Sequence, residues 1–250
     1  MEQITNAGVK IALRKTSLVD FPGKIASVLF FAGCGLRCPW CHNRELVLTE
    51  AAAAPADVQS AASEMLIGPD DALSHIKKRR NVLGGVVLSG GEPTLYRDLP
   101  VMIRRIKEIG LSVKLDTNGM NPDMLKKLFE TTETAPDYIA MDLKLAPHRY
   151  GEIAPNAKKA EDSLRKSAEL IRNSGIKHEY RTLALPNITE NDIAALAGLT
   201  DGAPWYVRAF RPGSCLDPSW NGFDASTEQA IGMLADKIRA LGKNGMAGGL

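Results

Sequence analysis

Three of the four cysteines in the chain, Cys34, Cys38 and Cys41, lie within one short loop. The loop follows an apolar run that ends in Phe-Phe-Ala-Gly. Three thiolates with gaps of three and two residues can hold a cubane iron–sulfur cluster at three of its corners, which leaves the fourth iron open for a ligand. Because cysteines grouped in this way are typical of metal or redox chemistry in a reducing compartment, the spacing predicts such a cluster.

The same residues allow other interpretations. The segment Cys38–Cys41 alone is typical of a thioredoxin-like dithiol, and with His42 it matches the attachment motif of c-type haem. Neither of these uses Cys34, and haem attachment usually follows export, for which the first residues carry no signal. A structural zinc ion held by the three thiolates and His42 is another alternative, but His42 is awkwardly placed directly after Cys41 to complete the same tetrahedron.

The elements that would position this loop follow from the alternation of apolar runs with segments of helical period. Most of the predicted strands lack strict alternation, as parallel strands buried on both faces do. The predicted strands are Ala26–Ala32, Gly85–Ser89, Leu111–Asp116, Tyr138–Leu143, Glu179–Leu185 and Trp205–Phe210. The predicted helices are Asp70–Lys78, Leu99–Ile109, a helix starting at Asn121-Pro122, Ala160–Arg172, Glu190–Leu199 and Ser226–Leu241.

Repeated strand–helix units predict right-handed crossovers and a parallel sheet, either open and doubly wound or a full or partial barrel. In both architectures ligands bind at the carboxyl ends of the strands, which is where the cysteine loop falls. We expect a single domain over residues 1–242 and a flexible tail at 243–250, because the tail is glycine-rich and without periodicity. The alanine-rich segment Leu48–Pro69 is expected to be an insertion or a surface helix.

Composition limits the class of protein further. The chain has 250 residues, of which 44% are hydrophobic and 24% charged, with a formal net charge of +2. These values exclude disordered and fibrous classes, and the small charge indicates neither a nucleic-acid nor a membrane partner. No uncharged stretch reaches the length of a membrane helix, and the chain is expected in the cytoplasm.

Beyond the cysteines, several motifs carry a family resemblance. The cysteine loop, with an aromatic residue before its last cysteine, resembles the radical S-adenosylmethionine superfamily, and Ser89–Pro93 resembles that superfamily's second motif. More narrowly, the chain resembles the glycyl-radical-enzyme activases, including the group labelled anaerobic ribonucleoside-triphosphate reductase activating protein, over about Thr16 to Arg211. The narrower motifs are Val19–Gly23, Cys41–Asn43, Leu115–Gly119, Met141–Lys144 and Glu179–Thr182.

This resemblance implies an α/β fold of the partial (β/α)6 barrel type, one [4Fe-4S] cluster and S-adenosylmethionine chelated to the open iron. The cluster would cleave the sulfonium reductively, and the 5′-deoxyadenosyl radical would remove a Cα hydrogen from a glycine of a partner glycyl radical enzyme. The partner would be anaerobic ribonucleotide reductase, and an external donor such as flavodoxin or ferredoxin would supply the electron. All of this chemistry is anaerobic.

The resemblance also assigns roles to residues. Cys34, Cys38 and Cys41 would be the metal ligands, with no catalytic residue beyond the cluster. Trp40 and His42 would flank the adenine. Glycines allow a close backbone approach and a carboxylate complements an ammonium group, so the methionyl amino group would meet the turn after the second predicted strand. That turn consists of Gly90, Gly91 and Glu92.

Charged residues at two further strand ends complete the predicted cofactor site. In the formate-lyase activases the carboxylates that match Asp116 and Asp142 help to hold a monovalent cation near the methionyl carboxylate. Two acids beside an anionic ligand need either such a cation or Lys144 to offset repulsion. Lys144 matches a residue that contacts the cofactor, and Arg181 is expected to point into the same cavity. A capping or surface salt-bridge role is the structural alternative for these charges.

The chain also departs from its relatives. Several activases have a histidine after the last barrel strand, whereas Arg211 stands at the comparable place here. Cys215 is expected to be a free, inert thiol, so an accessory cluster is not expected. Three hypotheses follow: an activase for a separate protein, a radical S-adenosylmethionine enzyme acting on a small molecule or peptide, and a non-enzymatic zinc or iron–sulfur binding module.

Overall fold

The computed structural model describes residues 11–48 and 66–248. The chain divides into two compact units. The first unit comprises Met1–Cys34, Glu45–Thr117 and Asp123–Tyr138, and the second comprises Gly35–Arg44, Asn118–Pro122 and Ile139–Leu250. The alanine-rich segment was expected to be an insertion or a surface helix. Its residues 49–65 lie outside the part of the chain that the structure describes.

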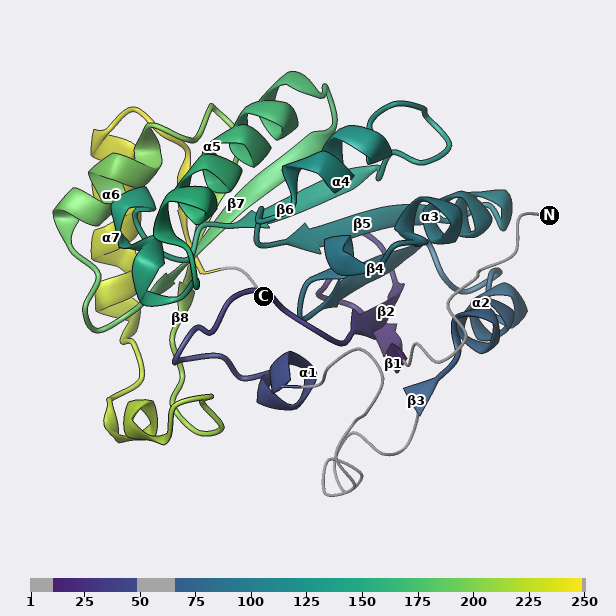
Figure 1. Ribbon diagram of the computed structural model, residues 1–250, viewed down its shortest axis with the longest axis horizontal. Helices are drawn as coiled ribbons and strands as arrows, with labels where there is room; N and C mark the ends of the chain where they lie inside the picture. The colour runs from purple at the N-terminus through teal and green to yellow at the C-terminus, as the bar shows by residue number, and fades with distance from the viewer. Residues whose placement is uncertain (1–10, 49–65, 249–250) are drawn as a thin grey trace. The chain divides into compact units, whose positions relative to one another are not determined.

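Six strands, each followed by a helix along the chain, confirm the predicted alternation (Figure 1). Each predicted strand and helix is present with its ends shifted by a few residues at most. The strands are β2 (Ala26–Phe31), β4 (Gly85–Gly90), β5 (Ser112–Thr117), β6 (Tyr138–Asp142), β7 (Lys177–Ala184) and β8 (Trp205–Ala209). The helices are α1 (Arg44–Leu48), α2 (Pro69–Lys78), α3 (Leu99–Glu108), α4 (Pro122–Leu128), α5 (Ala157–Asn173), α6 (Glu190–Ala197) and α7 (Glu228–Ala240).

In the first unit the strand order is β3-β1-β2-β4-β5. Strands β2, β4 and β5 are parallel, and Val28, Val87 and Lys114 stand side by side across them. Strand β1 (Ile11–Ser17) runs antiparallel to β2 and to the short β3 (Leu66–Ile67). The sequence did not predict β1, because exposed residues interrupt its apolar pattern.

In the second unit β7, β8 and β9 (Gly245–Ala247) are neighbours, and both pairs are parallel. The expectation of a flexible tail is therefore wrong for β9. A Cβ on Gly245 would lie 2.5 Å from the Ala235 carbonyl oxygen in α7, so only glycine lets β9 pass so close to that helix. Helices α6 and α7 pack side by side (Figure 1).

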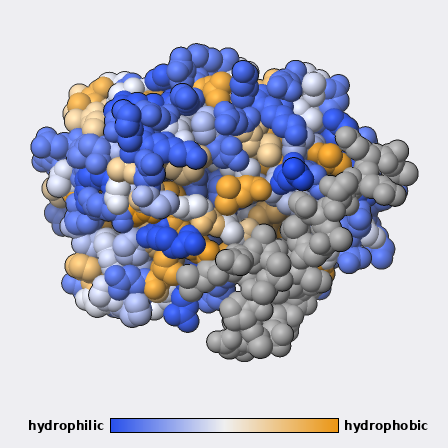
Figure 2. All heavy atoms as spheres, viewed as in Figure 1, coloured by the Kyte–Doolittle hydropathy of each residue, from blue (hydrophilic) through white to orange (hydrophobic). Residues whose placement is uncertain are grey.

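Three short 3-10 helices follow strand ends: η2 (Pro93–Leu95), η3 (Pro147–Glu152) and η4 (Pro218–Gly222). The face shown in Figure 2 is mostly hydrophilic with scattered hydrophobic residues, as globular surfaces are. Within the described part of the chain, no helix is both long and apolar enough to span a bilayer.

Candidate functional site

The two glycines after β4 bring this strand end against the backbone that precedes Cys34. Gly90 has φ +118°, and a Cβ on Gly91 would lie 2.1 Å from the Gly33 carbonyl oxygen. The Glu92 amide donates to that same oxygen at 2.8 Å. The sequence analysis expected the missing side chains of these glycines to let the methionyl group approach the backbone. In the structure, the backbone of Gly33 occupies the space beside Gly91. Both glycines therefore shape the start of the cysteine loop, and their contact with a cofactor stays a prediction.

Glu92 lies almost fully buried, with 1% of its surface exposed. Its Oε1 accepts hydrogen bonds from the Thr94 amide at 3.1 Å, the Thr94 hydroxyl at 2.6 Å and the Thr117 hydroxyl at 2.9 Å. These bonds satisfy a buried carboxylate oxygen and join the end of β4 to the end of β5. Glu92 thus holds two strand ends together, and its predicted role toward an ammonium group remains untested.

Asp116, near the end of β5, already has partners on both carboxylate oxygens. Oδ1 forms an ion pair with the Lys114 ammonium, and Oδ2 accepts a hydrogen bond from the Ser89 hydroxyl at 3.1 Å. Lys114 and Asp116 are two residues apart on one strand, so their side chains share a face. This ion pair was not predicted, although the spacing alone could have indicated it.

Asp142, the last residue of β6, links the two basic residues that the sequence predicted beside it. Its Oδ1 accepts from Arg181 Nε at 2.6 Å, and its Oδ2 accepts from Lys144 Nζ at 2.7 Å. Burial opposes ionisation of Asp142, but the charges of Arg181 and Lys144 outweigh it and hold the pKa of the carboxyl well below its usual range. These three side chains therefore lie together, and their contact with a cofactor stays a prediction.

The backbone of Lys144 is fixed by a hydrogen bond as well. Its amide donates to the hydroxyl of Tyr150 in η3 at 3.2 Å, and burial raises the pKa of that phenol, which therefore stays protonated. Burial opposes the charge on Lys144, but Asp142 and then Cys38 favour it, so the pKa of the ammonium lies above its usual range. An ammonium beside Cys38 in turn favours the thiolate that a metal ligand must be.

The segment around Cys38 and Cys41 is fixed within the second unit. Backbone hydrogen bonds join Arg37 to the Ile153 carbonyl at 2.7 Å and Cys41 to the Cys38 carbonyl at 3.0 Å. The side chain of Trp40 is 3% exposed, and its ring centroid lies 5.1 Å from that of Trp220 in η4. Trp40 thus packs on Trp220, whereas His42 is exposed, and the predicted place of both residues beside the adenine stays a prediction.

The loop after β8 is built against this segment. The Asp217 amide donates to the Pro39 carbonyl at 2.9 Å. Asn221 Oδ1 accepts from the amide of Cys215 at 3.1 Å. Cys215 is fully buried and free, as predicted, and Arg211, at the place of the family's late histidine, is exposed. The contact between Trp40 and Trp220 has no signal in the sequence, because 179 residues separate the first from the second.

None of the four cysteines, all of which the structure describes, forms a disulfide. Cys34 belongs to the first unit, and Cys38 and Cys41 belong to the second. Among the described residues, no three His, Cys, Asp or Glu side chains are grouped as ligands of a metal ion. Three thiols outside any disulfide are nevertheless the donor set that an iron–sulfur cluster requires.

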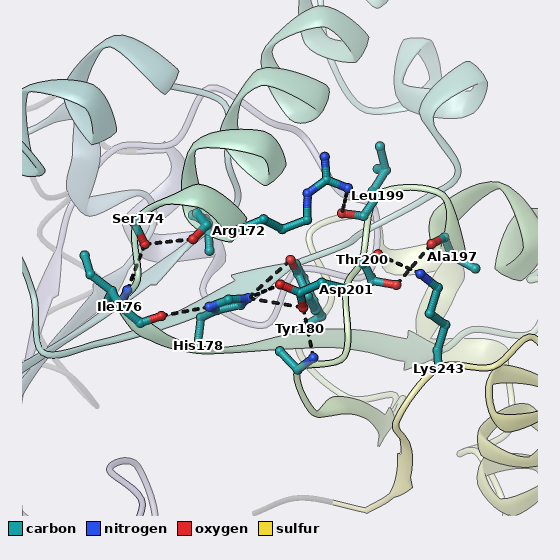
Figure 3. Close-up of polar contacts among 12 residues, drawn as sticks. Arg172, Ser174, Ile176, His178, Tyr180, Ala197, Leu199, Thr200, Asp201 and Lys243 are labelled. Carbon is teal, nitrogen blue, oxygen red and sulfur yellow. Dashed lines mark hydrogen bonds and ion pairs between the residues drawn. The ribbon is translucent and has the colours of Figure 1, made fainter.

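A second polar cluster lies toward the amino end of β7 (Figure 3). His178 Nδ1 lies 2.8 Å from the Ile176 carbonyl oxygen, and Nε2 lies 3.1 Å from Asp201 Oδ2. Tyr180 stands edge-on to the imidazole, with 5.5 Å between ring centroids. Because chemistry in such folds gathers at the carboxyl ends of strands, this cluster is best explained as a structural connection between β7 and the turn before β8.

Comparison with known proteins adds a family. The model of the Radical SAM superfamily matches residues 28–200, which is more than half of the chain. A protein of Methanocaldococcus jannaschii named as a glycyl-radical enzyme activating enzyme is 28% identical over 91% of this chain and 87% of its own length. The pyruvate formate-lyase-activating enzyme of Clostridium pasteurianum is 28% identical over 72% of this chain and 70% of its own length.

Solved structures agree with the fold. Streptococcus suis SuiB bound to S-adenosylmethionine matches with a TM-score of 0.58 and 14% identity, over 85% of this chain and 48% of SuiB. The chain therefore spans about half of that protein. QueE from Escherichia coli matches with a TM-score of 0.51 and 18% identity, over 94% of this chain and 90% of QueE. These likenesses confirm the predicted α/β fold, a partial (β/α)6 barrel.

Proposed function

Since this chain belongs to the radical SAM superfamily, we propose that it is an activating enzyme that installs a glycyl radical on a separate partner protein. Members of the superfamily use a [4Fe-4S] cluster and S-adenosylmethionine. The cluster supplies the electron that cleaves the sulfonium into methionine and a 5′-deoxyadenosyl radical, which takes a hydrogen atom from the glycine Cα and leaves the radical there. The chain's own residues bind, orient and shield the reactants.

One observation carries the choice of an activase. The similarity to the Methanocaldococcus jannaschii protein runs over 233 residues, 91% of this chain and 87% of that protein, so it extends beyond the segment 28–200 that the superfamily model matches. The similarity to the Clostridium pasteurianum enzyme supports the same class. Within the described residues, the elements beyond the six strand–helix units are short, which favours a substrate that brings its own cover for the radical.

The residue roles follow from the motifs and the contacts together. We assign the three cluster thiolates to Cys34, Cys38 and Cys41. The donor set fits a cluster because none of the three thiols is in a disulfide and Cys38 interacts electrostatically with Lys144. For the methionyl carboxylate we assign Lys144 and Arg181, which Asp142 holds together at 2.7 and 2.6 Å.

The remaining assignments rest on the family motifs. The backbone of Gly90 and Gly91 would meet the methionyl amino group, with Glu92 fixing that turn through Thr94 and Thr117. Trp40 and His42 would border the adenine. A small external electron carrier such as flavodoxin or ferredoxin would reduce the cluster, in the cytoplasm and without oxygen. Anaerobic ribonucleotide reductase is the partner that the narrower motifs favour.

The test is electron paramagnetic resonance under anaerobic conditions. The reconstituted protein, S-adenosylmethionine and a reductant are mixed with each glycyl radical enzyme from the same source. We expect slow cofactor cleavage by the protein alone, and a stable organic radical with an α-hydrogen doublet once the right partner is added. The partner with its acceptor glycine replaced by alanine is the matched control and should give no doublet.

A different outcome would favour the second hypothesis. If no candidate partner gives the doublet while a small metabolite or a peptide speeds 5′-deoxyadenosine formation, the chain is a radical enzyme with a different substrate. If no 5′-deoxyadenosine forms under reducing conditions, whether or not iron is incorporated, the non-enzymatic zinc or iron–sulfur binding module is the better account.

A further inference from the structure

Lys114 is a lysine where none is expected, in the middle of a buried parallel strand. Its side chain is only 3% exposed, and lysines are almost never buried without a partner. Its neighbours across the strands are apolar: Val87 stands beside it in β4, and Val28 stands beside Val87 in β2. Burying an ammonium group in apolar surroundings costs free energy, and a neighbouring negative charge is needed to offset that cost.

The anion that Lys114 meets is Asp116, whose side chain is 13% exposed. The Lys114 ammonium contacts Oδ1, and the Ser89 hydroxyl donates to Oδ2 at 3.1 Å. The carboxylate charge is thus matched by a fixed ammonium from its own strand. A free cation bound at Asp116 would stand within a few ångströms of that ammonium, where repulsion is strong at low effective dielectric.

Asp142 in the second unit is matched in the same way. Its two oxygens accept from Arg181 and from Lys144. Two positive charges on one carboxylate leave that group of residues with a net charge of +1. Both carboxylates to which the family resemblance gives a monovalent cation therefore carry basic side chains instead, and these residues do not fit such an ion.

We propose that Lys114 takes the place of a monovalent cation at Asp116, as the Lys144–Arg181 pair does at Asp142, so that S-adenosylmethionine binding and cleavage by this protein do not depend on potassium or sodium. Lys114 is then a positioning residue: it neutralises Asp116 and holds its carboxylate in place. This inference rests on the proposed use of S-adenosylmethionine and is independent of which glycine, if any, accepts the radical.

The first experiment measures cation binding directly. Equilibrium dialysis of the reconstituted protein with radioactive rubidium, a substitute for potassium, is done with and without S-adenosylmethionine. We expect no stoichiometric rubidium in the parent protein and about one bound ion per chain in Lys114→Met, because loss of the ammonium frees Asp116. Rubidium bound by the parent at one per chain would overturn the proposal, whatever the enzyme does with its cofactor.

The second experiment measures the response of the cofactor reaction. S-adenosylmethionine affinity and 5′-deoxyadenosine formation are compared in potassium chloride and in choline chloride at equal ionic strength. The parent should give the same values in both salts. Lys114→Met should lose affinity in choline by roughly tenfold, the worth of one charge-assisted contact, and recover it in potassium.

Two further variants separate positioning from simple damage. Lys114→Arg keeps the charge and should stay indifferent to potassium. Lys107→Met removes a lysine of the same unit whose ammonium pairs with Asp137 and not with Asp116, and it should behave as the parent. If Lys114→Met folds by circular dichroism but responds to potassium no more than the parent, the proposal is wrong. If it does not fold, a potassium-dependent parent would still overturn the proposal.

Discussion

At the scale of single residues, Asp142 shows how a charge cluster can be both a binding feature and a source of stability. Its pKa lies below the usual value because Arg181 and Lys144 outweigh the effect of burial. A carboxyl with a depressed pKa contributes stability that is fully present above its unfolded pKa, about 3.9, and is lost as the pH falls through the folded value. The pKa of Lys144 is raised, so its contribution is present below about 10.4 and is lost as the pH rises through the folded value.

We therefore predict that Asp142→Asn lowers the free energy of unfolding by about 1–3 kcal/mol at neutral pH, discounted for the partial exposure of the group. The deficit should shrink below about pH 4, because the carboxyl of the unfolded parent then takes up a proton, whereas the folded carboxyl with its lowered pKa still has none. Urea denaturation of the cluster-free protein across the acid range measures this. A deficit that stays constant down to the lowest pH would show that the carboxylate charge is not the source of the stability.

At the scale of elements, the strands and helices of the repeat were predictable because their signals are local. Apolar runs of strand length, the proline at the start of α4 and the glycine after α3 all lie within a few residues of the element they delimit. Strands β1 and β9 were missed because their identity depends on partners: β1 has exposed residues in its middle, and β9 is three residues beside β8.

The candidate site was predictable to the same extent. The motif residues were found, and the family resemblance placed Asp142, Lys144 and Arg181 at one cavity; hydrogen bonds join the three side chains. Their chemical environment was not anticipated. Gly91 packs against the backbone of Gly33. The two residues are far apart in the sequence, so the spacing of the motifs does not predict this contact.

The element that most directly supports the cysteine loop is η4. Trp220 packs on Trp40 and also contacts the rings of Phe210 and Phe223, with centroids 5.8 and 5.2 Å away. We predict that Trp220→Ala loosens the loop and speeds release of iron to a chelator roughly tenfold, since truncating a packed aromatic costs a few kcal/mol. Absorbance of the cluster during anaerobic chelation measures the rate.

Two variants of the same element serve as controls. Trp220→Phe keeps a ring against Trp40 and should restore most of the retention. Ser219→Ala changes an exposed neighbour in η4 and should leave the rate unchanged. Equal iron release from Trp220→Ala and the parent would mean that η4 packs on the loop without supporting it.

At the scale of the whole molecule, the cluster should act as a ligand of the folded chain. A group that binds the native state through deprotonated thiols and has no ordered site in the unfolded state raises the stability of the entire fold. The four cysteines divide into two classes for this purpose: three in the motif, and Cys215, which is fully buried within the loop after β8.

We predict that anaerobic reconstitution loads about four irons per chain and raises the melting temperature. Cys34→Ala, Cys38→Ala and Cys41→Ala should each lose the brown colour and the gain in melting temperature, because three corners need three thiolates. Cys215→Ala should keep both, apart from a small loss of packing that appears equally in the cluster-free protein. Iron analysis and thermal melts of both forms measure the difference. A chain that gains the same stability from zinc in Cys34→Ala as in the parent would contradict the cluster, because that metal site would then work without the first thiol of the motif.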